Sequence, residues 1–454
     1  MTKSQPSVLG RYMAGVDKAV DLTPERRNRV VDTWRVIALL VVVCGHWLAA
    51  SVWVEPDGSL TVMNTLEWIP YAGWFTWVVQ VMPVFFFVGG YANARALENK
   101  TTNRRSWITI RFRRLFSPAV PVIVVWTVLA LVLRNFIDDD LVYAGVLNAT
   151  LPLWFLAVYL TLVSIAPLTY AWWKSSGFVS VAVFAGAALA VDVASVRFDI
   201  TGIRWLNLVF VWATVHQLGY WWEARDRTDR VLTAPRALLL SGGALGTLIA
   251  VTVVEWYPVA MITIPGEGPN NVTPPTSAMT LLALVQIGVI LATVGPVTRL
   301  ASRRPRWKVV VAVSGFMMTI YVWHLTALSL SLAVGIFTLD GVAFSIEPGT
   351  AVWWMTRPIF YVVLAIATGL LVMAFARFEQ DIDTTTHSRP MVFVVIAMTA
   401  TITALAATAF IHLVERDASI NWWIPALAVA AAFAMRAYPA GWGRGTPATT
   451  RSRE

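Results

Sequence analysis

Long apolar segments recur along the whole chain, and they restrict what it can fold into more than any other feature. A helix needs about 20 predominantly apolar residues to cross the ~30 Å hydrocarbon core of a bilayer. Inside that core, only helices and closed barrels satisfy their own backbone hydrogen bonds. Twelve segments reach or approach this length, the fifth and the twelfth being the weakest: 34–53, 71–93, 115–134, 152–172, 178–194, 205–223, 236–256, 277–298, 309–336, 352–376, 391–414 and 421–438. The sequence predicts an all-α polytopic membrane helix bundle with about 12 transmembrane helices.

Composition agrees with a membrane location and argues against other classes of protein. The 454 residues are 57% hydrophobic and only 13% charged, whereas a soluble domain carries about 25% charged residues. The net charge of +9 is attributed to membrane topology and to contact with anionic membrane lipids, and no nucleic-acid partner is expected. The single cysteine, Cys44, excludes an internal disulfide and a cysteine-based metal cluster.

The basic residues are distributed unequally between the two sides of the predicted bundle. With the N-terminus inside, 30 of the 35 Lys and Arg residues fall on the inner side, and five fall on the outer side: Arg134, Arg197, Arg204, Arg357 and Arg416. Cytoplasmic loops carry such an excess. The sequence therefore predicts an integral protein of the bacterial plasma membrane with two cytoplasmic tails, residues 1–30, which show no cleaved signal peptide, and 439–454.

The first apolar segment carries a cation and an imidazole on one face. Arg35 and His46 are eleven residues apart, which is about three helical turns and ~16 Å along the axis. Ionisable groups are costly inside a membrane and usually serve a function there. The alternative is that neither residue is catalytic: the Arg side chain reaches lipid phosphate, and the His is buried and hydrogen-bonded within the protein.

These residue types at this spacing suit acyl transfer. A neutral His46 in a region of low polarity can take a proton from a hydroxyl group, as a general base does. The planar guanidinium of Arg35 can hold a phosphate or a carbonyl group. Asp32, three residues earlier, can pair with Arg35 and fix its orientation. We therefore take His46, Arg35 and Asp32 as the candidate catalytic residues.

Four motifs together point to a known family. The first is Asp32-Thr-Trp-Arg35 with His46-Trp47. The others are Met82-Pro-Val-Phe-Phe-Phe-Val-Gly89-Gly90-Tyr91, Leu153-Trp154-Phe155-Leu156 and Tyr321-Val-Trp-His324. In this order, over roughly residues 30–380, they resemble the motifs of the acyltransferase-3 family of integral membrane acyltransferases.

The resemblance implies a membrane O-acyltransferase with a core of ten helices at residues 31–380 and an additional hairpin at 391–438. It implies an acyl-CoA donor, acetyl-CoA first of all, and a hydroxyl acceptor on a cell-envelope glycan or glycolipid. Two positions depart from the family pattern. Gly89 replaces a common Ser, and Ala157-Val158-Tyr159 lacks the acidic residue that many members carry. The second departure leaves any carboxylate partner of His46 unidentified.

The donor and the acceptor are assigned to different candidate residues. Arg35 with Arg111, Arg113 and Arg114 is predicted to bind the phosphates of the donor. For the three arginines of the basic run, lipid contact and topology remain an equal alternative. Trp154, Tyr321 and His324 are predicted to line the acceptor site, with interhelical hydrogen bonding as the alternative reading of Tyr321 and His324.

Other features have simpler interpretations. His216 is expected to serve interhelical packing, and Asp192, Glu255 and Arg357 are expected to face water. The Phe85–Gly90 segment indicates close approach, either of a helix or of an acyl arm. No two histidines share a helix at ligand spacing, so no metal is expected. The competing functions are a secondary transporter, which would move a substrate without acyl-CoA, and a passive scaffold. The acceptor's identity and the oligomeric state are left open.

Overall fold

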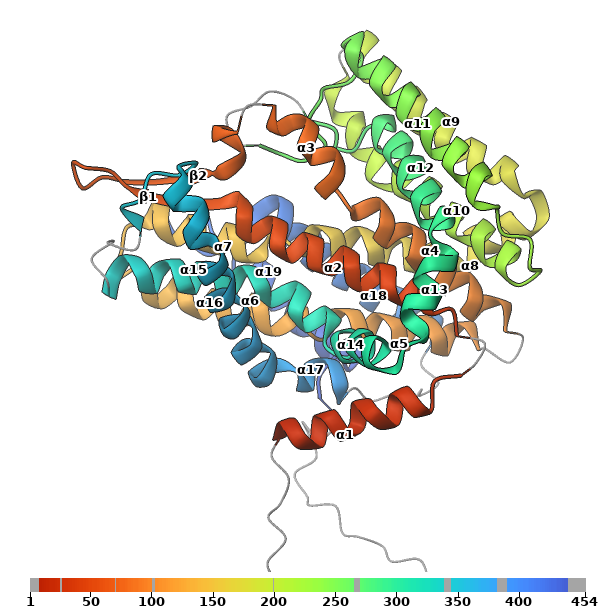
Figure 1. The fold of residues 1–454 in the computed structure, drawn as a ribbon. Coiled ribbons are helices and arrows are strands. Elements are labelled where there is room, and N and C mark those ends of the chain that lie inside the picture. The colour runs from red at the N-terminus through yellow and green to blue at the C-terminus, as the bar shows by residue number, and fades with distance from the viewer. Residues whose placement is uncertain are drawn as a thin grey trace, which may run out of the picture. The chain divides into compact units, whose positions relative to one another are not determined.

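The computed structural model describes residues 8–24, 27–69, 71–99, 103–198, 200–264, 270–338, 344–381 and 390–439, and Figure 1 shows the chain as a ribbon. The chain divides into two compact units. Unit 1 comprises Met1–Arg104, Val158–Met317 and His324–Thr368, and unit 2 comprises Arg105–Ala157, Met318–Trp323 and Gly369–Glu454. Three helices contribute residues to both units: α8 (Leu153–Ser176), α15 (Met317–Thr338) and α16 (Ala351–Phe375).

The remaining elements fall almost entirely within one unit. Unit 1 holds α1 (Val8–Asp21), α2 (Arg29–Ala49), β1 (Ala50–Val54), β2 (Leu60–Asn64), η1 (Thr65–Trp68), α3 (Ala72–Val79), α4 (Met82–Glu98), α9 (Phe178–Arg197), η2 (Thr201–Leu206), α10 (Asn207–Asp226), α11 (Ala234–Val253), α12 (Ser277–Ala292), α13 (Val294–Ser302) and α14 (Arg304–Ser314). Unit 2 holds α5 (Arg104–Phe116), α6 (Ala119–Leu133), α7 (Asp139–Thr150), α17 (Arg377–Gln380), α18 (Met391–Ala407), the π-helical turn η4 (Thr408–His412) and α19 (Trp423–Met435).

The predicted all-α membrane bundle is confirmed. Nine helical segments in the described ranges are long and apolar enough to span a membrane: Arg29–Ala49, Ala72–Glu98, Arg104–Leu133, Asp139–Ser176, Phe178–Arg197, Ala234–Val253, Met317–Thr338, Ala351–Phe375 and Met391–His412. A tenth is obtained if α12 and α13, which are bent by 55°, form one span.

Each of the twelve predicted segments contains a helix, but two differ from the expected full span. The 20-residue α10 carries the polar side chains of His216, Gln217 and Glu223 in its buried part and is not among the apolar spans. The last segment forms α19, whose 13 residues extend only about 20 Å. The hydrophobic core of a bilayer is ~30 Å thick, so α19 does not cross it unaided.

The first predicted helix ends four residues earlier than expected, at Ala49 instead of residue 53, because a β-hairpin follows α2 at once. Residues Ala50–Val54 pair antiparallel with Leu60–Asn64. Asp57 accepts hydrogen bonds from the backbone and side chain of Ser59, and Gly58 has a φ of 86°. Asp-Gly turns of this kind connect neighbouring strands. The hairpin therefore replaces the end of the predicted helix, and among the described residues it is the one two-stranded sheet.

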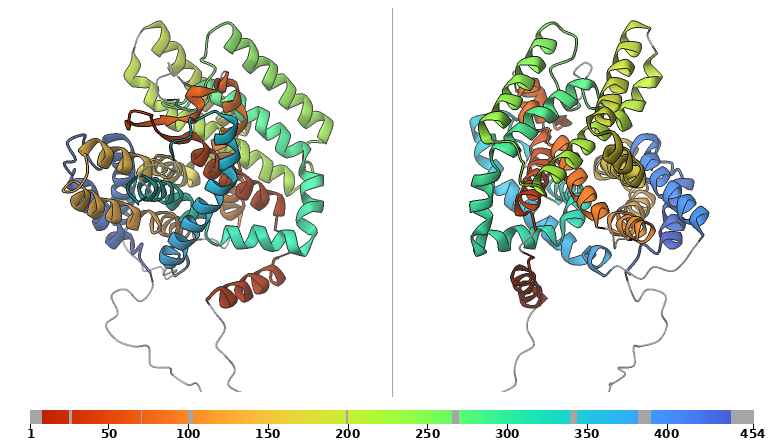
Figure 2. Two further views of the ribbon diagram at one scale, coloured as in Figure 1. Left: turned by 60° about the vertical axis from the view of Figure 1, so that its left-hand side comes forward. Right: turned by 90° about the vertical axis from the view of Figure 1, so that its right-hand side faces the viewer.

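Helix α4 lies directly against α10 because glycines remove the side chains at their crossing. A Cβ added to Gly90 would lie 1.9 Å from the carbonyl oxygen of His216, and one added to Gly219 would lie 2.2 Å from that of Phe87. Phe87 stacks on Trp222 with ring centroids 5.0 Å apart. In both views of Figure 2 another pair, α11 and α12, also runs side by side. The Phe85–Gly90 segment therefore serves helix packing.

Gly90→Ala should destabilise unit 1 strongly. The new methyl group would overlap a backbone carbonyl that cannot rotate away, and overpacking of this kind costs about 1–3 kcal/mol or more. Thermal unfolding in detergent measures the effect. Gly243→Ala on α11 is the matched control, because its added Cβ meets nothing within 4 Å. Equal unfolding temperatures for the two variants would contradict this account of the crossing.

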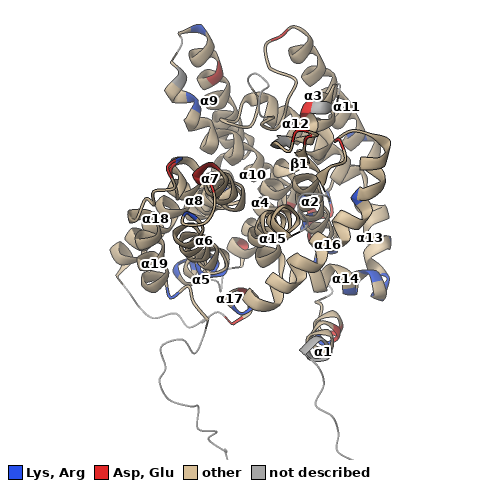
Figure 3. Cartoon of the chain, turned by 90° about the vertical axis from the view of Figure 1, so that its left-hand side faces the viewer, with Lys and Arg blue, Asp and Glu red and all other residues tan. Residues whose placement is uncertain are grey.

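The N-terminal region predicted as a tail contains helix α1, which packs on α14. Val16, Val20 and Trp307 share an apolar cluster. Lys308 pairs with Asp17 at 2.8 Å, and Arg304 pairs with Asp21 at 2.8 Å. Figure 3 marks acidic residues of α1 in red and basic residues of α14 in blue. Residues 1–7 of this tail, and all but residue 439 of the C-terminal one, lie outside the described residues.

Candidate active site

His46 and His324 meet in unit 1. His46 Nδ1 lies 2.8 Å from His324 Nε2, and the two ring centroids are 5.1 Å apart with an angle of 5° between the ring planes. His324 is fully buried, and His46 is half-buried. One of the two nitrogens must donate a hydrogen and the other must accept it, so a single proton occupies the space between the rings.

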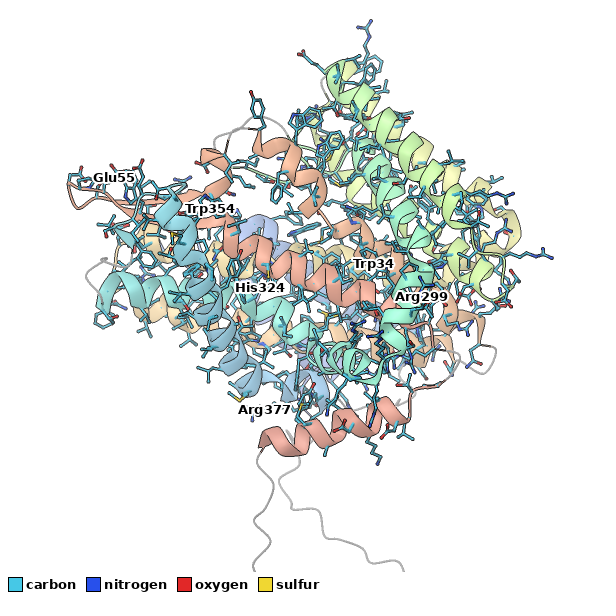
Figure 4. The ribbon with its side chains drawn as sticks, in the orientation of Figure 1. Trp34, Glu55, Arg299, His324, Trp354 and Arg377 are labelled. Carbon is cyan, nitrogen blue, oxygen red and sulfur yellow. The ribbon has the colours of Figure 1, made fainter. Side chains whose placement is uncertain are left out.

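Neighbouring groups hold this pair in place. The indole of Trp47 donates to the backbone carbonyl of His324 at 3.2 Å. Tyr361 of α16 donates to the carbonyl of Cys44 at 3.0 Å, and its ring lies 5.9 Å from that of Trp47. Figure 4 labels His324 beside α2. Residues of α2, α15 and α16 that belong to unit 1 therefore position the two imidazoles.

One nitrogen of the His46 imidazole remains available for proton transfer. Since Nδ1 of His46 faces His324, Nε2 is the nitrogen of His46 that can take a proton from another molecule. His324 can accept the Nδ1 hydrogen throughout, which selects one tautomer of His46 and fixes the plane of its ring. The orienting residue of a catalytic triad acts on its His in the same way.

At the first turn of α2, Asp32 binds two arginines. It accepts from Arg27 Nε at 2.7 Å and lies 3.6 Å from Arg35 Nη1. Asn28 caps the helix through hydrogen bonds from Val30 N and Val31 N. The pairing predicted between Asp32 and Arg35 is therefore present, with Arg27 as a second partner that the spacing did not suggest.

Three of the four arginines assigned to the donor lie on α5 and differ in their surroundings. Arg113 is buried, and its Nε donates to the carbonyl of Met435 at the end of α19, 2.5 Å away. Arg111 is half-buried and Arg114 is exposed. Residues i and i+3 share a helix face, so Arg111 and Arg114 form a pair from which Arg113 is separated. The structure gives Arg113 a packing role that the prediction had not foreseen.

Two of the residues assigned to the acceptor lie together in unit 2. The buried hydroxyl of Tyr321 donates to the carbonyl of Pro152 at 3.0 Å, and its ring lies 5.5 Å from Phe155. Trp154 is half-buried with its ring edge-on to Phe155. The contact of Tyr321 is the interhelical hydrogen bond that was the alternative interpretation. His324, the third residue, is part of the histidine pair in unit 1.

Comparison with known protein families gives one match. Residues 28–377 match a family model described as an acyltransferase domain, which covers 350 of the 454 residues (377 − 28 + 1). This chain belongs to the acyltransferase-3 family. The acyltransferase is thus an integral membrane enzyme that transfers acyl groups other than aminoacyl groups. Neither the comparison with curated proteins nor that with solved structures finds a match.

The family match of the acyltransferase ends before its C-terminal hairpin. Helices α18 and α19 lie beyond residue 377, and they pack on one another within unit 2. The carbonyl that binds Arg113 belongs to α19. The hairpin is therefore joined to α5 of the matched region by a buried hydrogen bond.

Sequence reasoning misplaced two charged residues of the acyltransferase that were expected to face water. Asp192 is buried and accepts hydrogen bonds from Asn207 at 2.8 Å, from Tyr257 at 2.8 Å and from the backbone of Ser277 at 2.7 Å. Arg357 is half-buried against aromatic rings. Exposure depends on neighbouring helices, which a single segment does not reveal.

Other expectations for the acyltransferase agree with the structure. Glu255 is exposed, and His216 contacts Asn93 of α4 at 3.0 Å, as interhelical packing requires.

Proposed function

We propose that this enzyme transfers an acyl group from acyl-CoA, in the first instance acetyl-CoA, to a hydroxyl of a cell-envelope glycan or glycolipid. His46 acts as the general base. The observation that carries the proposal is the 2.8 Å contact between His46 Nδ1 and His324 Nε2. It supplies the orienting partner that the sequence left unidentified.

A neutral partner suits a base inside a membrane. A carboxylate beside His46 would place a negative charge in the hydrocarbon region, at a cost of several kcal/mol. His324 accepts the same hydrogen without carrying a charge. When His46 gains a proton, the Nδ1 hydrogen still points at His324 Nε2, so the imidazolium remains hydrogen-bonded.

The reaction follows from this geometry. His46 Nε2 takes the proton of the acceptor hydroxyl while the hydroxyl oxygen forms a bond to the carbonyl carbon of the thioester. The carbon–sulfur bond then breaks, and the sulfur of CoA receives the proton from His46. The products are an ester and free CoA, and His46 returns to its neutral form.

The two substrates are proposed to arrive from opposite sides. Acyl-CoA binds on the cytoplasmic side, where the guanidinium of Arg35 contacts its phosphates. The acceptor arrives from the side on which α2 ends and the β1–β2 hairpin begins. This arrangement places both termini in the cytoplasm of a bacterial cell, with the enzyme in the plasma membrane.

Arg35→Lys should weaken the use of the donor. A lysine keeps the charge but loses the planar fork that binds two oxygens at once. Loss of one charge-assisted hydrogen bond, about 1.5–3 kcal/mol, predicts that kcat/KM for acetyl-CoA falls about tenfold or more. Arg299→Lys, an exposed arginine on α13, is the control. Unchanged kinetics at low acetyl-CoA concentration would remove Arg35 from the donor site.

Labelled acetyl-CoA tests the proposed reaction itself. The full-length protein is incubated in membranes with acetyl-CoA that carries a radioactive acetyl group, and lipids and glycans are then extracted. Label in one acceptor fraction, absent from membranes without the protein, is the expected result. Absence of label with acetyl-CoA and with longer acyl-CoA donors would contradict the proposal and favour transport.

A further inference from the structure

Arg357 places a guanidinium group within a spanning helix, where none of the described carboxylates pairs with it. It lies six residues after the first residue of α16, which is about 9 Å along the axis. Charged side chains in such segments are rare and normally pair with one another or with backbone carbonyls. Among the described residues, no carboxylate forms a salt bridge with Arg357.

Aromatic rings hold the guanidinium without neutralising it. Its central carbon lies 4.0 Å from the ring centroid of Trp353 and 4.7 Å from that of Phe360. One terminal nitrogen donates to Thr356 Oγ1 at 3.2 Å. The Nε atom is buried and has no hydrogen-bond partner among the described residues. A guanidinium fixed in this way keeps donors for an anion.

This guanidinium lies close to the histidine pair along α16. Tyr361, one turn after Arg357, contacts Trp47, the residue after His46, and the carbonyl of Cys44, two residues before His46. Figure 4 shows Trp354 at the same end as Glu55 of the β1–β2 hairpin. Along the axis of α16, Arg357 therefore lies about 6 Å from Tyr361, on the side where α2 ends.

We propose that Arg357 binds a phosphate or carboxylate group of the acceptor, and thereby directs the acceptor's hydroxyl to His46. The inference rests on the proposed function and narrows its acceptors to anionic glycans and phosphate-linked glycolipids. The anionic group and the reacting hydroxyl would be separated by about the length of one helical turn. At this separation, both can belong to one sugar or to two adjacent sugars. A phosphate of a bilayer lipid has the same chemistry, so the test separates these two sources.

The first measurement detects the anion without any turnover. Full-length protein in dodecyl maltoside is titrated with dodecyl phosphate and, separately, with inorganic phosphate, while its thermal unfolding is followed. Anion binding raises the unfolding temperature of the wild type. Arg357→Gln should need at least tenfold more anion for the same shift.

A second stacked arginine provides the matched control. Arg416→Gln also removes a guanidinium that lies over an aromatic ring, that of Tyr143 at 5.8 Å, and it should respond as the wild type does. An equal response of wild type and Arg357→Gln to both anions would overturn the proposal.

The second measurement assigns the anion to the acceptor. Octyl glucuronide and octyl glucoside differ in one carboxylate, and each is offered as acceptor with labelled acetyl-CoA. The wild type should prefer the glucuronide at least tenfold in kcat/KM, and the ratio should fall toward one in Arg357→Gln. An unchanged ratio would overturn the role in acceptor binding and identify a bilayer lipid as the source of the anion.

The two measurements also separate this inference from the proposed function. If wild type labels neither glycoside nor any extracted glycan or lipid, acyl transfer to such acceptors is contradicted. The unfolding experiment still decides whether Arg357 binds an anion, because it requires no reaction.

Discussion

His46→Ala should lower acyl transfer by at least about 100-fold. General acid–base catalysis contributes about 10²- to 10⁴-fold to a rate, and alanine offers no nitrogen to take the hydroxyl proton. The rate of label transfer from acetyl-CoA, divided by the amount of folded protein, measures this loss. The residual rate reflects binding and alignment of the substrates, which remain.

Folding must be controlled in this variant because His46 has a buried partner. Removing its ring leaves His324 Nε2 without the contact at 2.8 Å, and an unsatisfied buried polar group costs about 1–3 kcal/mol. His46→Gln keeps a polar side chain and should be equally inactive with a smaller loss of stability. His412→Ala, outside the matched region, should retain activity. Wild-type turnover in His46→Ala would exclude His46 as the base.

His324→Ala should lower kcat about 10- to 100-fold and leave KM for acetyl-CoA unchanged. The base is still present, but the hydrogen bond that fixes its tautomer and the plane of its ring is lost. This loss slows the chemical step and does not change donor binding. His324 is therefore a positioning residue. Steady-state kinetics of protein in neutral-lipid vesicles, with acetyl-CoA and one acceptor varied in turn, separate kcat from the two KM values.

A conservative replacement distinguishes positioning from other roles of His324. The side-chain carbonyl of Gln can accept the Nδ1 hydrogen of His46, so His324→Gln should recover much of the lost kcat. The role predicted from sequence, acceptor binding, requires instead that the acceptor's KM rises in both variants. A higher acceptor KM with unchanged kcat would contradict positioning.

The helices could be predicted from sequence because hydropathy is a local property. Each predicted apolar segment contains a helix, including Ala351–Phe375 and Phe178–Arg197, whose ends lie within a few residues of the expected ones. The β1–β2 hairpin was missed because its apolar first strand continues the apolar pattern of α2. The short α19 was overestimated because the helix ends at Arg436, whose φ of 55° stops it, whereas the predicted segment continued to residue 438.

The site was only partly predictable, for a related reason. The pairing of Asp32 with Arg35 follows from a spacing of three residues on one helix. His46 and His324 are separated by 278 residues, and only the packing of α2 against α15 brings them together. Each lies within a predicted apolar segment, 34–53 or 309–336, and this was the available signal. The hydrogen bond of Arg113 to α19 could not be foreseen, because the arginines of one run point to several faces of their helix.

A double-mutant cycle tests the central claim most directly. Transfer from labelled acetyl-CoA is measured for wild type, His46→Ala, His324→Ala and the variant that carries both changes. If His324 acts only through His46, its loss has no further effect once His46 is gone, and the double variant matches His46→Ala. The contrary result is a double variant that is slower than His46→Ala by the same factor by which His324→Ala is slower than the wild type. The two losses would then be independent, and this would contradict a functional pair.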